Sequence, residues 1–115
     1  MANLCIDIGN SRTKVAIYDK GKIAQCWKRK GLSIAWIEEA TKNYEIKSAI
    51  VSNTKSKYAH IRAYLKEKVP HYIALSHETP LPIKNHYATP TTLGRDRIAV
   101  VCAAHHLYPN KNVLV

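Results

Sequence analysis

Short apolar runs separated by polar links make up the first part of the chain, which is the pattern of β-strands. The runs cover residues 3–8, 13–18 and 23–28. The second link, at 19–22, contains Gly21, which can adopt the positive φ of a tight turn. Because the links are short, the pattern predicts three consecutive antiparallel strands.

Beyond residue 30 the apolar residues recur at helical spacing, and two short apolar strands interrupt the helices. Ser33 is expected to be the N-cap of the first helix, and Pro70 is expected to stop the second. The expected elements are a helix at 34–41, a strand at 48–52, a helix at 57–69 and a strand at 72–75.

Several prolines mark residues 76–92 as irregular, and a last helix is expected at 93–108. The order βββ-α-β-α-β-α predicts an α/β domain with a mixed sheet and resembles the ribonuclease H-like unit. We assign residues 1–111 to this domain. The apolar residues 112–115 are expected to be the first strand of a second domain, which is truncated there.

The chain has 115 residues, of which 46% are apolar, which suits one domain with a modest core. No stretch approaches the roughly 20 apolar residues that span a membrane, and no basic leader precedes an apolar block. We therefore expect a cytoplasmic protein without a membrane partner. The formal net charge of +10 favours nucleotides, nucleic acid or acidic small molecules as partners, without choosing among them.

The turn between the first two strands carries a run that suits the phosphates of a nucleotide: Asp7, Ile8, Gly9, Asn10, Ser11, Arg12, Thr13 and Lys14. Gly9 lets the backbone approach a ligand, and successive amides in such a turn form an anion-binding concavity. Ser11 and Thr13 offer hydroxyls, and Lys14 offers a point charge. Asp7, at a strand end, can orient a hydrated Mg²⁺. The alternative is an ordinary hairpin turn.

A second motif begins the last helix and consists of Gly94, Arg95, Asp96 and Arg97. Helix N-termini attract anions, and the two arginines add anion-binding groups. Asp96 should stay ionised between them and can accept a proton. Tyr87, seven residues before Gly94 in the proline-marked loop, is placed where a substrate lid could be. Without a ligand, the same residues also suit a surface salt bridge and a packed loop aromatic.

Taken together, these residues resemble the type III pantothenate kinase family, a member of the actin-like ATPase superfamily. That family places an Asp-x-Gly-Asn-Thr motif on its first hairpin and a Gly-x-Asp-Arg motif where pantothenate binds. Residues 7–11 and 94–97 match these motifs in order, distance and structural setting. Ser11 stands where the family usually has threonine, which keeps the hydroxyl.

The resemblance implies ATP-dependent phosphorylation of pantothenate to 4′-phosphopantothenate, the first step of coenzyme A biosynthesis. Phosphoryl transfer depends on positioning and charge stabilisation. By position, Asp96 is the general base, and residues 7–14 hold ATP with Asp7 near Mg²⁺. The substrate-binding residues implied are Tyr87, Gly94, Arg95, Asp96 and Arg97.

The resemblance also implies a homodimer and a potassium or ammonium ion. In that family a second phosphate loop, of Asp-Ala-Gly-Thr type, follows a strand like 113–115. Because the sequence given does not contain it, we expect residues 1–115 to be inactive alone.

Nucleic-acid binding is the leading alternative, because a basic ribonuclease H-like unit could bind a phosphate backbone. A nuclease of that fold clusters several carboxylates around two metals, whereas the chain has only three aspartates, and Asp19 falls in a turn away from Asp7. A transcriptional regulator is the other alternative, because sequences of this family have also been labelled Baf-type activators. A DNA-binding protein would not require the 94–97 motif together with Tyr87.

Overall fold

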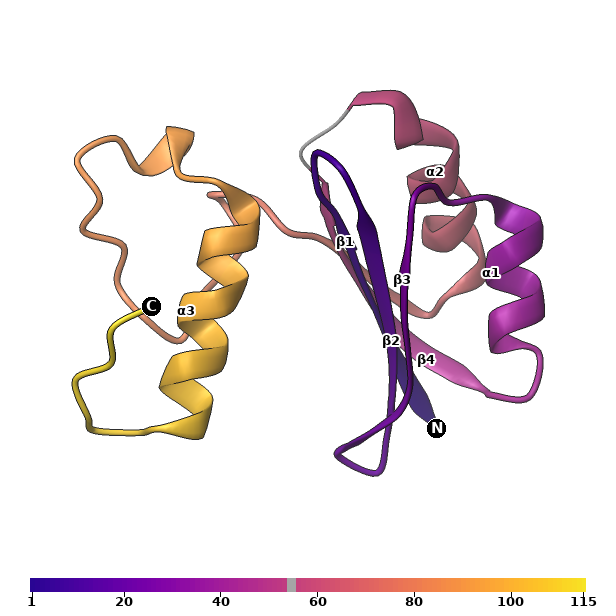
Figure 1. The fold of residues 1–115 in the computed structure, drawn as a ribbon, viewed down its shortest axis with the longest axis horizontal. Helices are drawn as coiled ribbons and strands as arrows, with labels where there is room; N and C mark the ends of the chain where they lie inside the picture. Colours follow the sequence, from indigo (N-terminus) through magenta and orange to yellow (C-terminus); the bar gives the residue numbers. More distant parts are fainter. Residues whose placement is uncertain (54–55) are drawn as a thin grey trace.

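The structure is a computed structural model, and it describes residues 1–53 and 56–115. Five strands form one sheet in the order β3-β2-β1-β4-β5 (Figure 1). The strands are β1 Ala2–Ile8, β2 Thr13–Asp19, β3 Lys22–Arg29, β4 Ile46–Asn53 and β5 His71–Ala74. Strands β1 to β3 are antiparallel neighbours, whereas β1, β4 and β5 run parallel. The predicted meander and the mixed sheet are both confirmed, and β1 lies at the centre of the sheet.

The helices lie on both sides of this sheet. They are α1 Ile34–Thr41, α2 Ala59–Lys68 and α3 Arg95–Leu107, with short 3-10 turns η1 Ser56–Tyr58 and η2 Pro90–Thr92. Helices α1 and α2 cover one side, and α3 stands on the other side together with the loop that precedes it (Figure 1). Ser33 is the N-cap of α1, as predicted, because its side chain accepts a hydrogen bond from the amide of Trp36 at 3.1 Å. Among the described residues, no helix has the length and apolar character to cross a membrane.

A two-residue turn fixes the hairpin between β2 and β3. Lys20 has a φ of 54° and Gly21 a φ of 76°, so both residues are left-handed. Two consecutive left-handed residues are typical of the type I′ turn, whose twist matches that of the flanking strands. The glycine predicted for this turn is therefore where the backbone requires it.

Alternation along β1 and β2 separates the core from the site. Leu4, Ile6 and Ile8 are buried and belong to the core cluster, to which β2 adds Val15 and Ile17. The intervening residues of both strands therefore point to the opposite face, on the side of α3. This division decides which residues of the first motif can reach a ligand.

The strand predicted over 112–115 is wrong, because these residues have no regular secondary structure. Leu114 is fully exposed, and no strand of the described residues pairs with this segment. A strand is stable only when its backbone groups bond to a neighbouring strand. The loop before η2 is irregular, as predicted, and runs alongside α3 (Figure 1).

The core assignment predicts a contrast between two isoleucines on neighbouring strands. Ile17 is 0% exposed, whereas Ile23 is 57% exposed. We expect Ile17→Ala to lower the free energy of unfolding by about 2–5 kcal/mol, because it leaves a cavity in the core. Ile23→Ala, the matched control, should cost less than about 1 kcal/mol. Urea unfolding measures both, and equal losses would contradict the assigned core.

Candidate functional site

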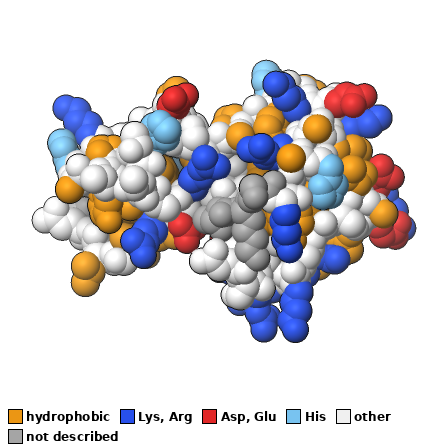
Figure 2. All heavy atoms as spheres, turned by 90° about the horizontal axis from the view of Figure 1, so that it is seen from above, with side chains coloured by type: hydrophobic (Ala, Val, Ile, Leu, Met, Phe, Trp, Pro, Cys, Tyr) orange, Lys and Arg blue, Asp and Glu red, His pale blue; other side chains and the backbone are white. Residues whose placement is uncertain are grey.

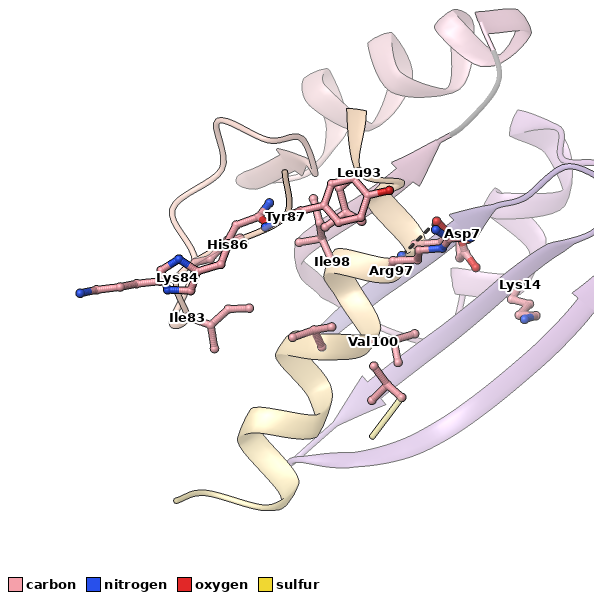
Figure 3. A pocket seen from close by; sticks show the side chains of 15 residues that line it. Asp7, Lys14, Ile83, Lys84, His86, Tyr87, Leu93, Arg97, Ile98 and Val100 are labelled. Carbon is pink, nitrogen blue, oxygen red and sulfur yellow. Dashed lines mark hydrogen bonds between the residues drawn. The ribbon is translucent and has the colours of Figure 1, made fainter. Parts of the chain in front are cut away.

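A cavity of about 750 Å³ lies along α3, where the loop before η2 and the ends of β1 and β2 approach that helix (Figure 3). Four segments line it: the end of β1 with the start of β2, the loop before η2 together with Leu93, the first turns of α3, and the C-terminal Val115. Its polar lining includes Asp7 and Lys14 from the first motif and Asp96 and Arg97 from the second, together with Tyr87. The fold therefore brings residues of both predicted motifs to one place.

Asp7 lies on the cavity side of the central strand. It pairs in register with Lys14 of β2, and both side chains line the cavity. One carboxylate oxygen of Asp7 is buried and has no hydrogen-bond partner among the described residues. Burial raises the pKa of Asp7, the charge of Lys14 lowers it, and the negative charge of Asp96 raises it further. The carboxylates of the two motifs are thus close enough to repel each other.

The rest of the first motif divides between core and solvent. The amide of Gly9 donates a hydrogen bond to the carbonyl of Arg12 at 3.0 Å, and a Cβ at Gly9 would lie 3.1 Å from that oxygen. This close approach explains the glycine. The side chains of Ile8 and Thr13 are buried in the core, so only their backbone groups could contact a nucleotide. The side chains of Asn10, Ser11 and Arg12 are exposed at the tip of the hairpin.

Gly94 makes room for the carboxylate of Asp96. A Cβ on Gly94 would lie only 2.6 Å from Asp96 Oδ1, so any side chain there would displace the carboxylate. The same oxygen accepts a hydrogen bond from the amide of Arg97 at 3.0 Å. None of the hydrogen bonds among the described residues uses Asp96 Oδ2. One oxygen of Asp96 is therefore held by the helix start, and the other is available to accept a proton.

Arg95 fastens this helix start to the sheet. Its Nη1 donates a hydrogen bond to the carbonyl of Asn53, at the end of β4, at 3.2 Å. Neither Arg95 nor Gly94 lines the cavity, although both were predicted to bind substrate. Arg97 and Tyr87 do line it, and Figure 3 shows the Tyr87 hydroxyl pointing toward the side where Asp7 and Arg97 lie.

The carboxylates of the site suit Mg²⁺ but not a nuclease metal pair. Asp19 pairs with Ala2 at the far end of β2, away from Asp7. Within the described parts of the chain, no group of three histidine, cysteine or acidic residues could hold a metal. Mg²⁺ needs only one or two carboxylates together with substrate phosphates and water. The unpartnered oxygen of Asp7 and the nearby Asp96 fit this requirement.

Sequence reasoning missed Ser52, which lies beside Asp7 in the parallel pairing of β1 with β4. The signal that could have found it is topological. The carboxyl ends of parallel strands meet at one edge of a sheet, so polar residues ending neighbouring strands are brought together there.

Comparisons with known proteins agree on one family. A family model described as type III pantothenate kinase matches residues 3–115. Proteins named type III pantothenate kinase are 42% identical in Phocaeicola vulgatus and 37% identical in Bacteroides fragilis, each over 98% of this chain. One in Porphyromonas gingivalis is 31% identical over 98% of the chain. The matched region is 47%, 46% and 46% of these relatives, so the chain spans about half their length.

The environment of Asp7 predicts that Asp7→Asn raises the free energy of unfolding at pH 7 in buffer without divalent cations. Because the pKa of Asp7 is raised, the folded chain keeps this proton to a higher pH than the unfolded chain does. The stabilisation that this proton gives the folded chain is fully present below the ordinary aspartate pKa of 3.8. It is lost as the pH rises through the raised pKa of Asp7 in the folded chain.

The stability gained by the variant should therefore be larger at pH 7 than near pH 4. Urea unfolding at both pH values measures it, with Asp19→Asn, at the far end of β2, as the control. A loss of stability at pH 7, or a gain that does not change with pH, would show that Asp7 is not an unfavourably placed carboxylate.

Proposed function

The chain belongs to the type III pantothenate kinase family, and from that premise we propose that it contributes the ATP- and pantothenate-binding site of an enzyme that phosphorylates pantothenate. The product is 4′-phosphopantothenate, and the reaction is the first step of coenzyme A biosynthesis. The observation that carries the proposal is the single cavity lined by Asp7 and Lys14 from one motif and by Asp96 and Arg97 from the other.

Asp96 is the general base in this proposal. Its Oδ2 accepts the proton of the pantothenate hydroxyl while the hydroxyl oxygen bonds to the γ-phosphorus of ATP and the bond to ADP breaks. The hydrogen bond from the Arg97 amide to Oδ1 and the space above Gly94 support this role, because they hold the carboxylate in one orientation. Such fixed orientation is much of what an enzyme supplies to phosphoryl transfer.

Positive groups on both sides of Asp96 bind the two anionic substrates. The Lys14 ammonium and the backbone amides of the β1–β2 turn face the ATP phosphates, whose charge they stabilise. The Arg97 guanidinium pairs with the pantothenate carboxylate, and Tyr87 closes over the same substrate. Arg95 acts indirectly, because its bond to Asn53 fixes the helix start that carries Asp96.

The surface around the site supports anionic substrates. Figure 2 shows lysine and arginine side chains on both sides of the junction between the sheet and the α3 part, with an acidic side chain between them. Such a field attracts anions and raises their local concentration. The net charge of +10 over the whole chain acts in the same direction.

Family membership supports further features of the enzyme as part of the proposal. Asp7 and Asp96 would hold Mg²⁺, which when bound neutralises charge on the transferred phosphoryl group. A potassium or ammonium ion, a homodimer and a cytoplasmic location complete the proposal. Neither the family model nor the relatives favours the nucleic-acid alternative.

A chimera tests the proposed reaction and the role of Asp96. This chain replaces the 113 matched residues of the Phocaeicola vulgatus relative, and ADP release is followed with ATP and pantothenate. We expect turnover, which Asp96→Asn lowers by roughly 10²–10⁴-fold because the general base is lost. The KM for pantothenate should change little, and the 115-residue chain alone should show no turnover. A folded chimera no faster than its Asp96→Asn variant would contradict the proposal.

Arg97→Ala in the same chimera tests how the two substrates are divided between the motifs. The variant should raise the KM for pantothenate by at least about tenfold, because a charge-assisted bidentate pair is lost. The KM for ATP should change less than about twofold, because the nucleotide is assigned to the β1–β2 turn. Arg62→Ala, on the surface of α2, is the control for loss of one positive charge. Equal losses for both substrates would remove Arg97 from the pantothenate side.

A further inference from the structure

Two residues paired on neighbouring strands at the centre of the sheet each have a buried oxygen without a hydrogen-bond partner among the described residues. Ser52 and Asp7 are paired in register on the parallel strands β4 and β1. Ser52 is only 5% exposed, and both its Oγ and Oδ1 of Asp7 lack a hydrogen-bond partner within the described residues. Both residues line a second cavity, of about 350 Å³, which shares Asp7 and Lys14 with the larger one.

Two buried, unpartnered acceptor oxygens indicate that a third polar group donates hydrogen bonds to them when the site is occupied. About nine in ten buried polar atoms in proteins are hydrogen-bonded, and those that are not usually mark a functional site or a bound water. Neighbouring strands are roughly 5 Å apart, which leaves the two oxygens near enough to share one water molecule. Of the other side chains that line this cavity, Cys5, Lys14 and Tyr18 carry donors, but none of them donates to either oxygen.

We propose that Ser52 is a positioning residue for a divalent cation, and that its hydroxyl and the Asp7 carboxylate together accept hydrogen bonds from one water bound to that cation. Mg²⁺ keeps several of its waters, so groups that hold those waters also hold the ion. A cation-bound water has two hydrogens to donate, and Asp7 Oδ1 and Ser52 Oγ are the two acceptors. The proposed water lies at the edge of the larger cavity, on the side of Asp7 and Lys14.

The inference deepens the proposed kinase function, on which it rests for the use made of the cation. Binding of the cation itself requires neither pantothenate nor turnover. The experiment therefore uses Mn²⁺ alone as the probe, added to the 115-residue chain without nucleotide. Free Mn²⁺ is counted by electron paramagnetic resonance, in which the bound ion gives a broadened signal.

The Mn²⁺ affinities of four variants are compared with that of the parent chain. Asp7→Asn should remove most of the binding, because the negative charge that attracts the cation and its water is lost. Ser52→Ala should weaken Mn²⁺ affinity by roughly tenfold, the lower end of the effect of losing a group that supports a metal ligand. Ser52→Thr keeps the hydroxyl and should restore affinity to within about threefold of the parent. Ser48→Ala removes a hydroxyl from the same face of β4, four residues away, and should have no effect.

The outcomes separate this inference from the proposed function. Ser52→Ala binding Mn²⁺ as tightly as the parent chain would overturn the inference, and so would a parent chain that binds no Mn²⁺. An equal loss in Ser48→Ala would also overturn it, because the effect would then not be local to Ser52. If the chimera has no kinase activity but Mn²⁺ affinity still depends on Ser52, the proposed function is rejected. The cation site is then retained.

Discussion

The site depends on one constraint, the alternation of side chains along the central strand β1. Residues at even positions are held in the core, so a shift of one residue would bury Asp7 and expose Ile8. Pairing with strands on both sides then sets a row across the sheet, in which Lys14, Asp7 and Ser52 are neighbours on β2, β1 and β4. A basic group, a carboxylate and a hydroxyl thus share one level without any loop having to place them.

Helix α3 needs a separate attachment, because it stands on the opposite side of the sheet from α1 and α2 (Figure 1). The hydrogen bond from Arg95 to the Asn53 carbonyl supplies one, and buried Ile98 supplies another. Together they bring Asp96 near enough to Asp7 for their charges to repel. A pair of neighbouring carboxylates with an unpartnered oxygen lowers stability in the free protein, and a bound cation would relieve that repulsion.

Local features made much of the fold predictable from sequence. The strands and helices came within about two residues of their observed ends, because apolar runs, Ser33 and Gly21 act through nearby residues. The strand expected at 112–115 failed because strand formation depends on a partner, which an apolar run does not reveal. The residues of both motifs could be identified in the sequence, because each motif is a short continuous run. Ser52 and the Arg95–Asn53 bond were not predicted, because both depend on contacts between distant parts of the chain.

The proposed function requires that the β1–β2 turn and the start of α3 form one site for two anionic substrates. Amide chemical shifts of the ¹⁵N-labelled chain, recorded during titration with ATP–Mg²⁺ and separately with pantothenate, test it directly. We expect ATP to shift the amide signals of residues 9–14 and pantothenate to shift those of Tyr87 and residues 94–98, with the Asp7 amide shifted by both. Shifts confined to another surface, such as that around Trp27 and Trp36, would contradict it.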